Sequence, residues 1–345
     1  MRLRTGKPPA PEPIEARRSG AARGPGAERE GMPPGAILTA AMKVLLLVNS
    51  SASSVTARAR VVIQKALGAD HQVIVAETSR RGHATRLAQG AAATGTELVV
   101  VLGGDGTLNE AANGLAGSDC ALAALPGGST NVFARTLGLP DDPVEATGVL
   151  LDALALDRIR PAGLGYVQGR FFLFHVGLGF DASVVSRVER HSKLKRYAGH
   201  PLFLWAGLDT WVRHYDRSRP HMALRYADGL QVDDGYLTIV LNTDPYTYLG
   251  ARPLSLAPEA TLDRGLAVIC VRTMAMVPML RLVAGLLRSP DAVRKHPKVH
   301  HRVDVTDLDV TGLRPFPYQV DGDHLGDVME LHIEHRPDAL RLVVP

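Results

Sequence analysis

The stretch from Val99 to Glu110 constrains the fold of this 345-residue chain more than any other, because an apolar run meets a loop of three glycines and one carboxylate there. The β-branched run stops at Gly103 and helical spacing resumes near Leu108, which predicts a strand, a tight loop and a helix start. Glycines let backbone N–H groups approach an anion, and a helix N-terminus adds positive potential, so we expect a phosphate here. Asp105 would repel a bare phosphate. We therefore also expect a cation such as Mg²⁺, or a hydroxyl awaiting deprotonation, beside it.

A second loop of the same kind, Pro126–Asn131, follows another apolar run. Ser129 or Thr130 can cap the helix that comes next and can also offer a hydroxyl to a phosphate, although capping alone would explain these residues. Neither loop has the Walker A or the G-x-G-x-x-G spacing, which disfavours a P-loop and a Rossmann dinucleotide site.

Apolar runs and helical spacing alternate between Lys43 and about Ile159, which predicts a parallel sheet with helices on both faces. Loops rich in Gly, Ser, Thr and Asn follow three of the strands, and ligands bind at that edge of such a sheet. The expected strands are Lys43–Val48, Gln72–Ala76, Glu97–Leu102 and Ala121–Leu125, and the expected helices are Thr56–Leu67, one opened by Thr78 and Ser79, and Asn109–Leu115.

The pattern changes after about Ile159 to short strands separated by turns, which is typical of an antiparallel, sandwich-like domain. The predicted fold class is thus an N-terminal α/β nucleotide-binding domain (42–160, completed by 336–345) and a C-terminal antiparallel β-sandwich domain (161–335). The expected strands are Tyr166–Val167, Arg170–His175, Met222–Tyr226, Tyr236–Asn242, Leu266–Arg272, Val303–Val310, Tyr318–Asp321 and Ala339–Val344, with helical stretches at Ser183–His214 and Val277–Arg288.

Composition narrows the classes of protein further. Residues 1–41 are rich in Pro, Gly, Ala and Arg and are expected to be a disordered tail, with Met42 as an alternative start. That tail carries +3 of the net charge of +4, so the rest of the chain lacks the basic surface of a nucleic-acid-binding protein. The chain has two cysteines, Cys120 and Cys270, which are too few for a disulfide framework, so we expect reduced thiols in a cytosolic protein. No apolar run reaches the ~18–20 residues that a membrane span requires.

Four motifs in order resemble the catalytic-domain signature of diacylglycerol kinase-type lipid kinases, among them bacterial soluble lipid kinases and sphingosine kinases. The motifs are Gly103–Leu115, Pro126–Pro140, Gly177–Ala182 and Val320–Gly322. The resemblance implies an ATP-dependent phosphotransferase with Mg²⁺, which transfers the γ-phosphoryl group to the hydroxyl of a diacylglycerol-like lipid and gives a phosphatidic acid-like product. The resemblance also implies an ATP-binding α/β domain, a β-sandwich domain that takes the lipid, and an active-site cleft between them.

The resemblance also assigns nucleotide contacts to residues of this chain. The first loop departs from the family pattern, since Ser50 stands where the family often has proline and the loop lacks its usual glycine. The implied nucleotide-binding residues are Asn49, Ser53, Thr78, Gly103, Gly104, Gly106, Thr107, Gly128, Ser129 and Asn131.

Two acids are the candidate catalytic residues, Asp105 and Asp323. The family commonly ends its last motif with Asp-Gly-Glu, whereas this chain has Asp-Gly-Asp, so Asp323 would act as general base on a shorter side chain. Asp105 remains an alternative proton acceptor. A guanidinium cannot ligate a cation. Because Arg264 follows Asp263 where relatives carry Asp-Asp-Gly, we expect the structural Mg²⁺ site to be absent or replaced by an Arg264 ion pair.

Two further residues are candidates for contact with the lipid. Asp181 lies in a glycine-flanked turn, where a role near the acceptor competes with simple turn capping. His175 stands where relatives often have Asn, and a buried, hydrogen-bonded histidine is the alternative to a substrate contact.

Basic residues beside apolar segments, at 187–211 and 274–302, suit an anionic bilayer surface, although each apolar face could instead pack on the core. We therefore expect a cytoplasmic protein peripherally associated with the inner face of the membrane, with a homodimer left open. The alternative functions are an NAD kinase, a kinase of long-chain bases, and a non-catalytic nucleotide-binding regulator.

Overall fold

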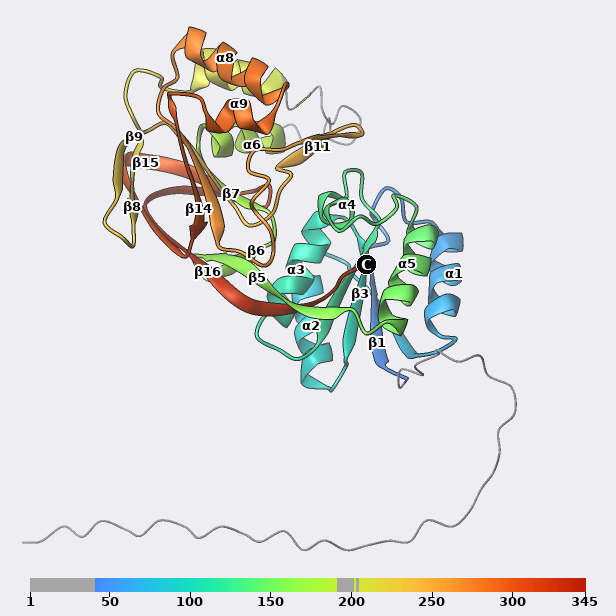
Figure 1. Ribbon diagram of the computed structural model, residues 1–345. Helices are drawn as coiled ribbons and strands as arrows, with labels where there is room; N and C mark the ends of the chain where they lie inside the picture. The colour runs from blue at the N-terminus through green and yellow to red at the C-terminus, as the bar shows by residue number, and fades with distance from the viewer. Residues whose placement is uncertain (1–40, 191–201, 203–204) are drawn as a thin grey trace, which may run out of the picture. The chain divides into compact units, whose positions relative to one another are not determined.

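The computed structural model describes residues 41–190, 202 and 205–345 (Figure 1). The expected disordered tail lies outside the described residues, apart from Ala41. Four parallel strands form the N-terminal sheet in the order β2-β1-β3-β4. They are β1 (Lys43–Val48), β2 (Gln72–Glu77), β3 (Leu98–Gly103) and β4 (Ala121–Pro126), and the helices of this part are α1 (Ala57–Leu67), α2 (His83–Ala93), α3 (Asp105–Leu115), α4 (Val132–Thr136) and α5 (Pro143–Ala155).

Two helices begin at residues that the sequence did not predict. Helix α2 begins at His83 rather than at Thr78 and Ser79, because Gly82 has a left-handed φ of 73° and ends the preceding turn. Helix α3 begins at Asp105 rather than at Asn109, so Asp105 belongs to the first helical turn. Helix α5 was not predicted, although Asp142 caps it by accepting two backbone N–H bonds.

The second part of the chain is rich in antiparallel strands, which confirms the predicted fold class. Its helical elements are α6 (Phe180–Arg190), the π-helical turn η1 (Thr210–His214), α8 (Met276–Leu286) and α9 (Pro290–Arg294). Its strands are β5 (Ile159–Val167), β6 (Arg170–Phe172), β7 (His175–Gly179), β8 (Met222–Tyr226), β9 (Gln231–Gly235), β10 (Leu237–Leu241), β11 (Thr247–Leu249), β12 (Arg252–Leu254), β13 (Leu266–Val271), β14 (Val299–Val305), β15 (Asp307–Val320) and β16 (Asp323–Val343).

Strand β16 joins the two parts. Over its 21 residues it pairs antiparallel with β15 and β5, and its end pairs parallel with β4 at Arg341 and Leu342. The hydrogen-bonded path therefore runs through one continuous sheet of 14 strands.

Two predicted strands, Arg170–His175 and Val303–Val310, are wrong as single elements, and the second is divided at Thr306 between β14 and β15. Strand β6 ends at Phe172 and β7 begins at His175, because the N–H groups of residues 173–175 turn toward the carboxylate of Asp321. The chain bends there and leads into the candidate site.

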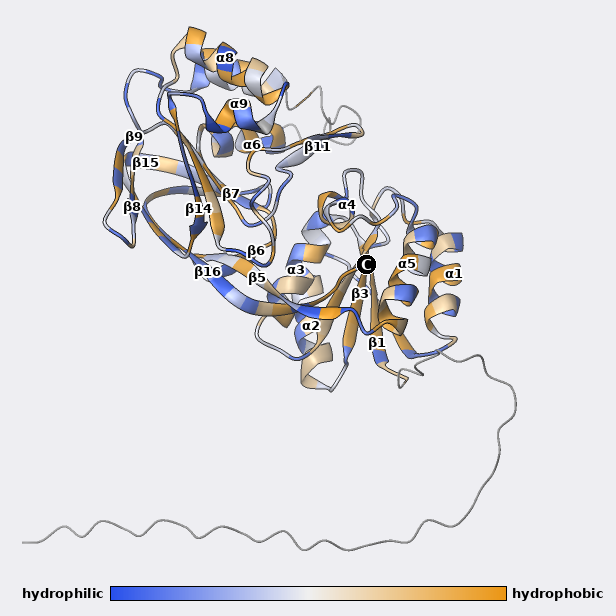
Figure 2. Cartoon of the chain, viewed as in Figure 1, coloured by the Kyte–Doolittle hydropathy of each residue, from blue (hydrophilic) through white to orange (hydrophobic). Residues whose placement is uncertain are grey.

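Three main buried clusters support these elements. The largest lies in the N-terminal sheet and its helices, the second lies among the strands of the second part, and the third packs α8 against β10 and β13. Figure 2 shows hydrophobic residues concentrated along β1 and β3. Among the described helices, none combines the length and apolarity that crossing a membrane requires.

Candidate active site

The two glycine loops lie against each other at the carboxyl edge of β3 and β4. The N–H of Gly127 donates to the carbonyl of Gly103 at 2.9 Å. A Cβ added to Gly127 would come within 2.8 Å of the Gly103 backbone, and a Cβ on Gly128 would come within 2.8 Å of the Gly104 Cα. Only glycine allows this backbone contact, so the structure brings the two predicted loops together.

Asp105 ties the same two loops by its side chain. Its carboxylate oxygens accept the N–H groups of Val132 (3.0 Å) and Phe133 (3.1 Å) at the start of α4. Burial raises the pKa of Asp105, and these N–H bonds act in the opposite direction. Asp105 is thus a helix cap supplied across a loop, and both of its oxygens are already engaged.

Asn49, in the first loop, joins the same edge. Its backbone N–H donates to the Leu102 carbonyl at 3.0 Å, and its side-chain amide donates to the Thr107 hydroxyl at 2.9 Å. Asn131 has a left-handed φ of 46° and closes the second loop through two bonds with Gly128. These polar contacts order three strand-end loops around one edge of the sheet.

The remaining predicted nucleotide residues lie on that edge with accessible groups. Thr78 follows β2, and its N–H donates to the Val48 carbonyl at 2.9 Å. Ser53, Gly106 and Ser129 are exposed. The arrangement leaves hydroxyls and the N-terminus of α3 open to solvent.

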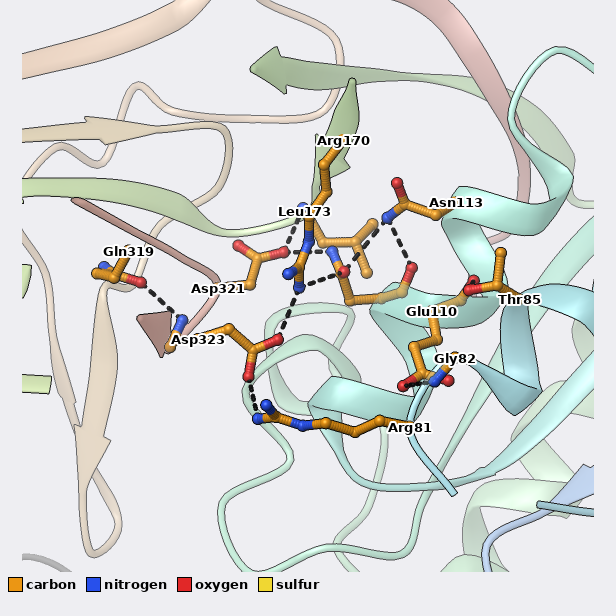
Figure 3. Close-up of polar contacts among 12 residues, drawn as sticks. Arg81, Gly82, Thr85, Glu110, Asn113, Arg170, Leu173, Gln319, Asp321 and Asp323 are labelled. Atoms are coloured by element: carbon orange, nitrogen blue, oxygen red, sulfur yellow. Dashed lines mark hydrogen bonds and ion pairs between the residues drawn. The ribbon is translucent and has the colours of Figure 1, made fainter. Parts of the chain in front are cut away.

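Asp323 is held by two arginines from distant parts of the chain (Figure 3). The guanidinium of Arg81 donates to Oδ1 at 2.6 Å, and that of Arg170 donates to Oδ2 at 2.9 Å. Arg170 also donates to the side-chain oxygen of Asn109 at 3.1 Å. Sequence reasoning missed both arginines, and no local motif marks them.

Asp321, two residues earlier, is a second acid that the sequence analysis gave no role. Its carboxylate accepts the N–H groups of Leu173 (2.8 Å), Phe174 (3.0 Å) and His175 (3.0 Å), and the side-chain amide of Asn109 at 2.5 Å. Burial raises the pKa of Asp321 to about 7, although these donors and Arg170 act to lower it. Asn109 therefore connects α3 of the first part to the Asp321 turn of the second.

We expect Asp321→Asn to destabilise the protein by about 3 kcal/mol, because its NH₂ group would face backbone N–H donors in a buried site. Denaturant unfolding of the wild type and the variant measures the difference. Asp327→Asn, which removes an exposed acid of the same hairpin, should change stability little. Equal stability of Asp321→Asn and wild type would contradict the structural role.

Two more polar residues of α3 hold this junction. The Asn113 side chain accepts from the Phe171 N–H at 2.8 Å and donates to its carbonyl at 2.9 Å, as a strand partner would. The Glu110 carboxylate accepts the N–H groups of Gly82 and Ala84 and so caps α2. Within the first motif, Asn113 thus positions β6 and Glu110 positions the start of α2.

The two predicted lipid contacts lie inside the second part. Buried Asp181 accepts the Tyr246 hydroxyl at 2.6 Å and the Gln319 amide at 2.8 Å. Burial lowers the pKa of His175, whose ring lies tilted by 41° against that of Tyr246 with a centroid distance of 4.4 Å. The Nδ1 atom of His175 has no hydrogen-bond partner among the described residues. Both side chains pack in the interior of the second part, and a contact of Asp181 or His175 with a substrate stays a prediction.

Arg264 pairs with Asp304 through two hydrogen bonds, the Nε–Oδ1 bond at 2.9 Å. Asp263 lies 3.8 Å from the guanidinium of Arg160. Among the described residues, no group of three or more His, Cys, Asp and Glu side chains could hold a metal ion. The residue before Gly265 is Arg264, and its guanidinium forms an ion pair with the carboxylate of Asp304.

We expect Arg264→Asp to create a divalent-cation site, because the new carboxylate would lie beside Asp304 and near Asp263. Calorimetric titration with Mg²⁺ in the absence of nucleotide measures this binding. Arg264→Gln, which removes the cation without adding an acid, is the matched control. Equally tight Mg²⁺ binding by the wild type at this position would overturn the expectation.

The sequence of this chain is similar to those of known lipid kinases. Residues 43–167 match the diacylglycerol kinase catalytic domain. The chain is 35% identical over 239 residues to a diacylglycerol kinase of Bacillus subtilis (strain 168), covering 68% of this chain and 75% of that protein. It is 29% identical over 317 residues to a probable lipid kinase YegS-like of Pseudomonas aeruginosa (strain UCBPP-PA14), covering 88% and 94%.

Solved structures show the same fold. A diacylglycerol kinase from Bacillus anthracis str. Sterne superposes with a TM-score of 0.63 at 23% identity, covering 88% of this chain and 97% of that one. This likeness supports the arrangement of an α/β part followed by a β-rich part.

Proposed function

Because this chain belongs to the family of diacylglycerol kinase catalytic domains, it is a phosphotransferase with an alcohol group as acceptor, and we propose that it transfers the γ-phosphoryl group of ATP to the hydroxyl of a diacylglycerol-like lipid. The product would be a phosphatidic acid-like lipid. The observation that carries the proposal is the pair of glycine loops, which Asp105 joins at the N-termini of α3 and α4.

In this proposal the phosphates of ATP lie against the two loops. The backbone N–H groups of Gly104, Gly106 and Ser129 would donate to phosphate oxygens, assisted by the dipole of α3, whereas those of Thr107 and Gly128 already donate to the Gly104 carbonyl and to Asn131 Oδ1. Asn49, Ser53, Thr78 and Ser129 would hold the rest of the nucleotide. Because Asp105 fixes the loops relative to each other, these donors would be pre-organised before ATP binds.

Asp105 and the nearby hydroxyls fit a Mg²⁺ ion that arrives with ATP. Mg²⁺ is commonly held by one or two carboxylates together with substrate phosphates and water, and each Asp105 oxygen keeps a lone pair beyond its N–H bond. Bound Mg²⁺ would neutralise the charge that develops on the transferred group.

We place the proton acceptor at Asp323, with Asp105 ordering the phosphate loops. Asp323 lies on the hairpin of the second part, the side from which a lipid hydroxyl would approach. The Arg81 side chain is 80% exposed, so its guanidinium can turn toward phosphate and free Asp323 Oδ1 to accept the hydroxyl proton. Arg170 would keep the carboxylate in position.

We also propose that the two parts of the chain bind different substrates. Residues 42–160 with 336–345 would bind ATP, and 161–335 would bind the lipid from the cytoplasmic face of a membrane. A kinase of long-chain bases or of NAD would share the loops, and a non-catalytic regulator would share the fold.

Transfer of label from radiolabelled ATP tests these alternatives. The protein is incubated with MgATP and, in parallel, with diacylglycerol, a long-chain base and NAD, with Asp105→Asn as background. We expect label in an organic-soluble phosphatidic acid-like product. Label in NAD or in the long-chain base would replace the proposal, and no transfer to any acceptor would favour the regulator.

A further inference from the structure

Helix α8 carries two apolar faces, and only one of them packs on the protein. Leu282 is buried, and Met279 and Leu286 pack beside it in the cluster formed with β10 and β13. These three residues hold the helix in place. The opposite face exposes Met276 (57%), Val277 (57%), Leu280 (62%), Val283 (49%) and Leu287 (46%).

The spacing of this outer face is regular. Residues 276, 280, 283 and 287 recur at intervals of four, three and four, so their side chains form one stripe along the helix. Single exposed apolar residues are ordinary on a protein surface, whereas a contiguous stripe marks an interaction site. Figure 2 shows hydrophobic residues along α8 interrupted by hydrophilic ones.

The charge beside the stripe identifies the kind of partner. Residues 276–298 contain five Lys or Arg and a single acid, Asp291, which pairs with Arg294. The exposed side chains of Arg281, Arg288 and Lys298 form no ion pair with any described residue. Cations that flank an apolar helix face match the headgroups and the acyl boundary of an anionic bilayer.

A second copy of the chain fits this face less well. A symmetric contact between two copies would bring the same patch together from both sides, so Arg281 and Arg288 would meet their counterparts. That juxtaposition of like charges costs binding free energy.

We propose that the outer face of α8, formed by residues 276, 277, 280, 283 and 287, docks the protein on an anionic lipid surface. The proposal rests on the proposed lipid kinase function and names the surface that would bring the enzyme to its substrate. The apolar stripe enters the boundary between headgroups and acyl chains, and Arg281 and Arg288 contact lipid phosphates.

Flotation of the full chain with vesicles tests the docking face without any turnover. The vesicles are phosphatidylglycerol and phosphatidylcholine in equal parts, or phosphatidylcholine alone. Leu280→Glu should lower the partition coefficient on the mixed vesicles by about ten-fold or more. The matched control is Leu156→Glu, since Leu156 is also 62% exposed but lies at the end of α5; its binding should stay within about two-fold of the wild type.

A second variant tests the charge independently. Arg281→Gln with Arg288→Gln should lower binding to the mixed vesicles by about five-fold for each cation removed, with little change on phosphatidylcholine alone. Equal binding by the wild type, Leu280→Glu and the double variant would overturn the proposal. So would a shift from dimer to monomer in Leu280→Glu, measured by sedimentation, with vesicle binding unchanged.

A kinase assay on monomeric short-chain diacylglycerol separates this inference from the proposed function. Leu280→Glu should phosphorylate that substrate at the wild-type rate, because it needs no membrane. If the wild type binds vesicles through α8 but phosphorylates no diacylglycerol, the proposed function fails while the docking face stands. If the wild type phosphorylates the monomeric lipid and Leu280→Glu binds vesicles normally, the docking face fails while the function stands.

Discussion

Asp105→Asn is expected to lower phosphoryl transfer by roughly 10³-fold or more while the protein stays folded. An asparagine offers one oxygen, and its NH₂ group would face an N–H of α4 at the other position. The two glycine loops would then separate, and the negative charge that faces a bound cation would be lost. Steady-state assay with MgATP and diacylglycerol, beside a thermal unfolding scan, measures both effects.

Asp142→Ala is the control that separates lost capping from lost chemistry. Asp142 caps α5 by accepting two N–H groups, as Asp105 does for α4, but it lies outside the glycine loops. Its loss should cost about 1 kcal/mol of stability and leave turnover intact. A folded Asp105→Asn protein with normal turnover would refute the assignment of this loop pair as the catalytic centre.

Asp323→Asn is expected to lower kcat by roughly 10²–10⁴-fold, the range for loss of a general base, with little change in ATP affinity. The asparagine can still contact Arg81 or Arg170 through its oxygen, but it cannot take the hydroxyl proton. Single-turnover rates at saturating ATP and lipid measure the chemical step directly. Asp323→Glu should keep much of the activity, because the longer carboxylate occurs in the family motif.

Asp327→Asn is the matched control, since it removes the same charge from the exposed side of the same hairpin. It should leave the single-turnover rate at the wild-type value. An unchanged chemical step in Asp323→Asn, together with a raised KM for the lipid, would move Asp323 from proton acceptor to a positioning residue and leave Asp105 as the candidate base.

The sequence predicted the elements that have strong local signals. The bounds of β1 were correct because a continuous apolar run must lie between two helical layers. The prediction of helix α1 was correct, and the helix begins after Thr56 because the hydroxyl of Thr56 accepts the N–H of Ala59. The predicted start of α3 was wrong because an acid after glycine is typical of a loop, whereas the N–H groups of Thr107 and Leu108 donate to the Gly104 carbonyl and include Asp105 in the first helical turn.

The site was predicted where it depends on strand ends and was missed where it depends on long-range pairs. The loops after β1, β3 and β4 meet because parallel strands share an edge, which the alternating pattern implies. Arg81 and Arg170 lie 242 and 153 positions from Asp323, so no spacing rule connects them. The same holds for Asn109, which reaches Asp321 across 212 positions.

The pairing of β16 with β4 has a consequence for how the protein is made. During synthesis, β4 emerges from the ribosome with an open edge, and the partner residues 341 and 342 follow more than 200 positions later. Until then the nascent N-terminal sheet exposes unpaired N–H and C=O groups beside an apolar strand, an arrangement prone to pairing with other chains. The pairing of β16 with β4 is therefore a late step, and the N-terminal sheet lacks its native edge partner while the residues between these two strands are synthesised. Slow release or truncation before residue 339 should favour aggregation over folding.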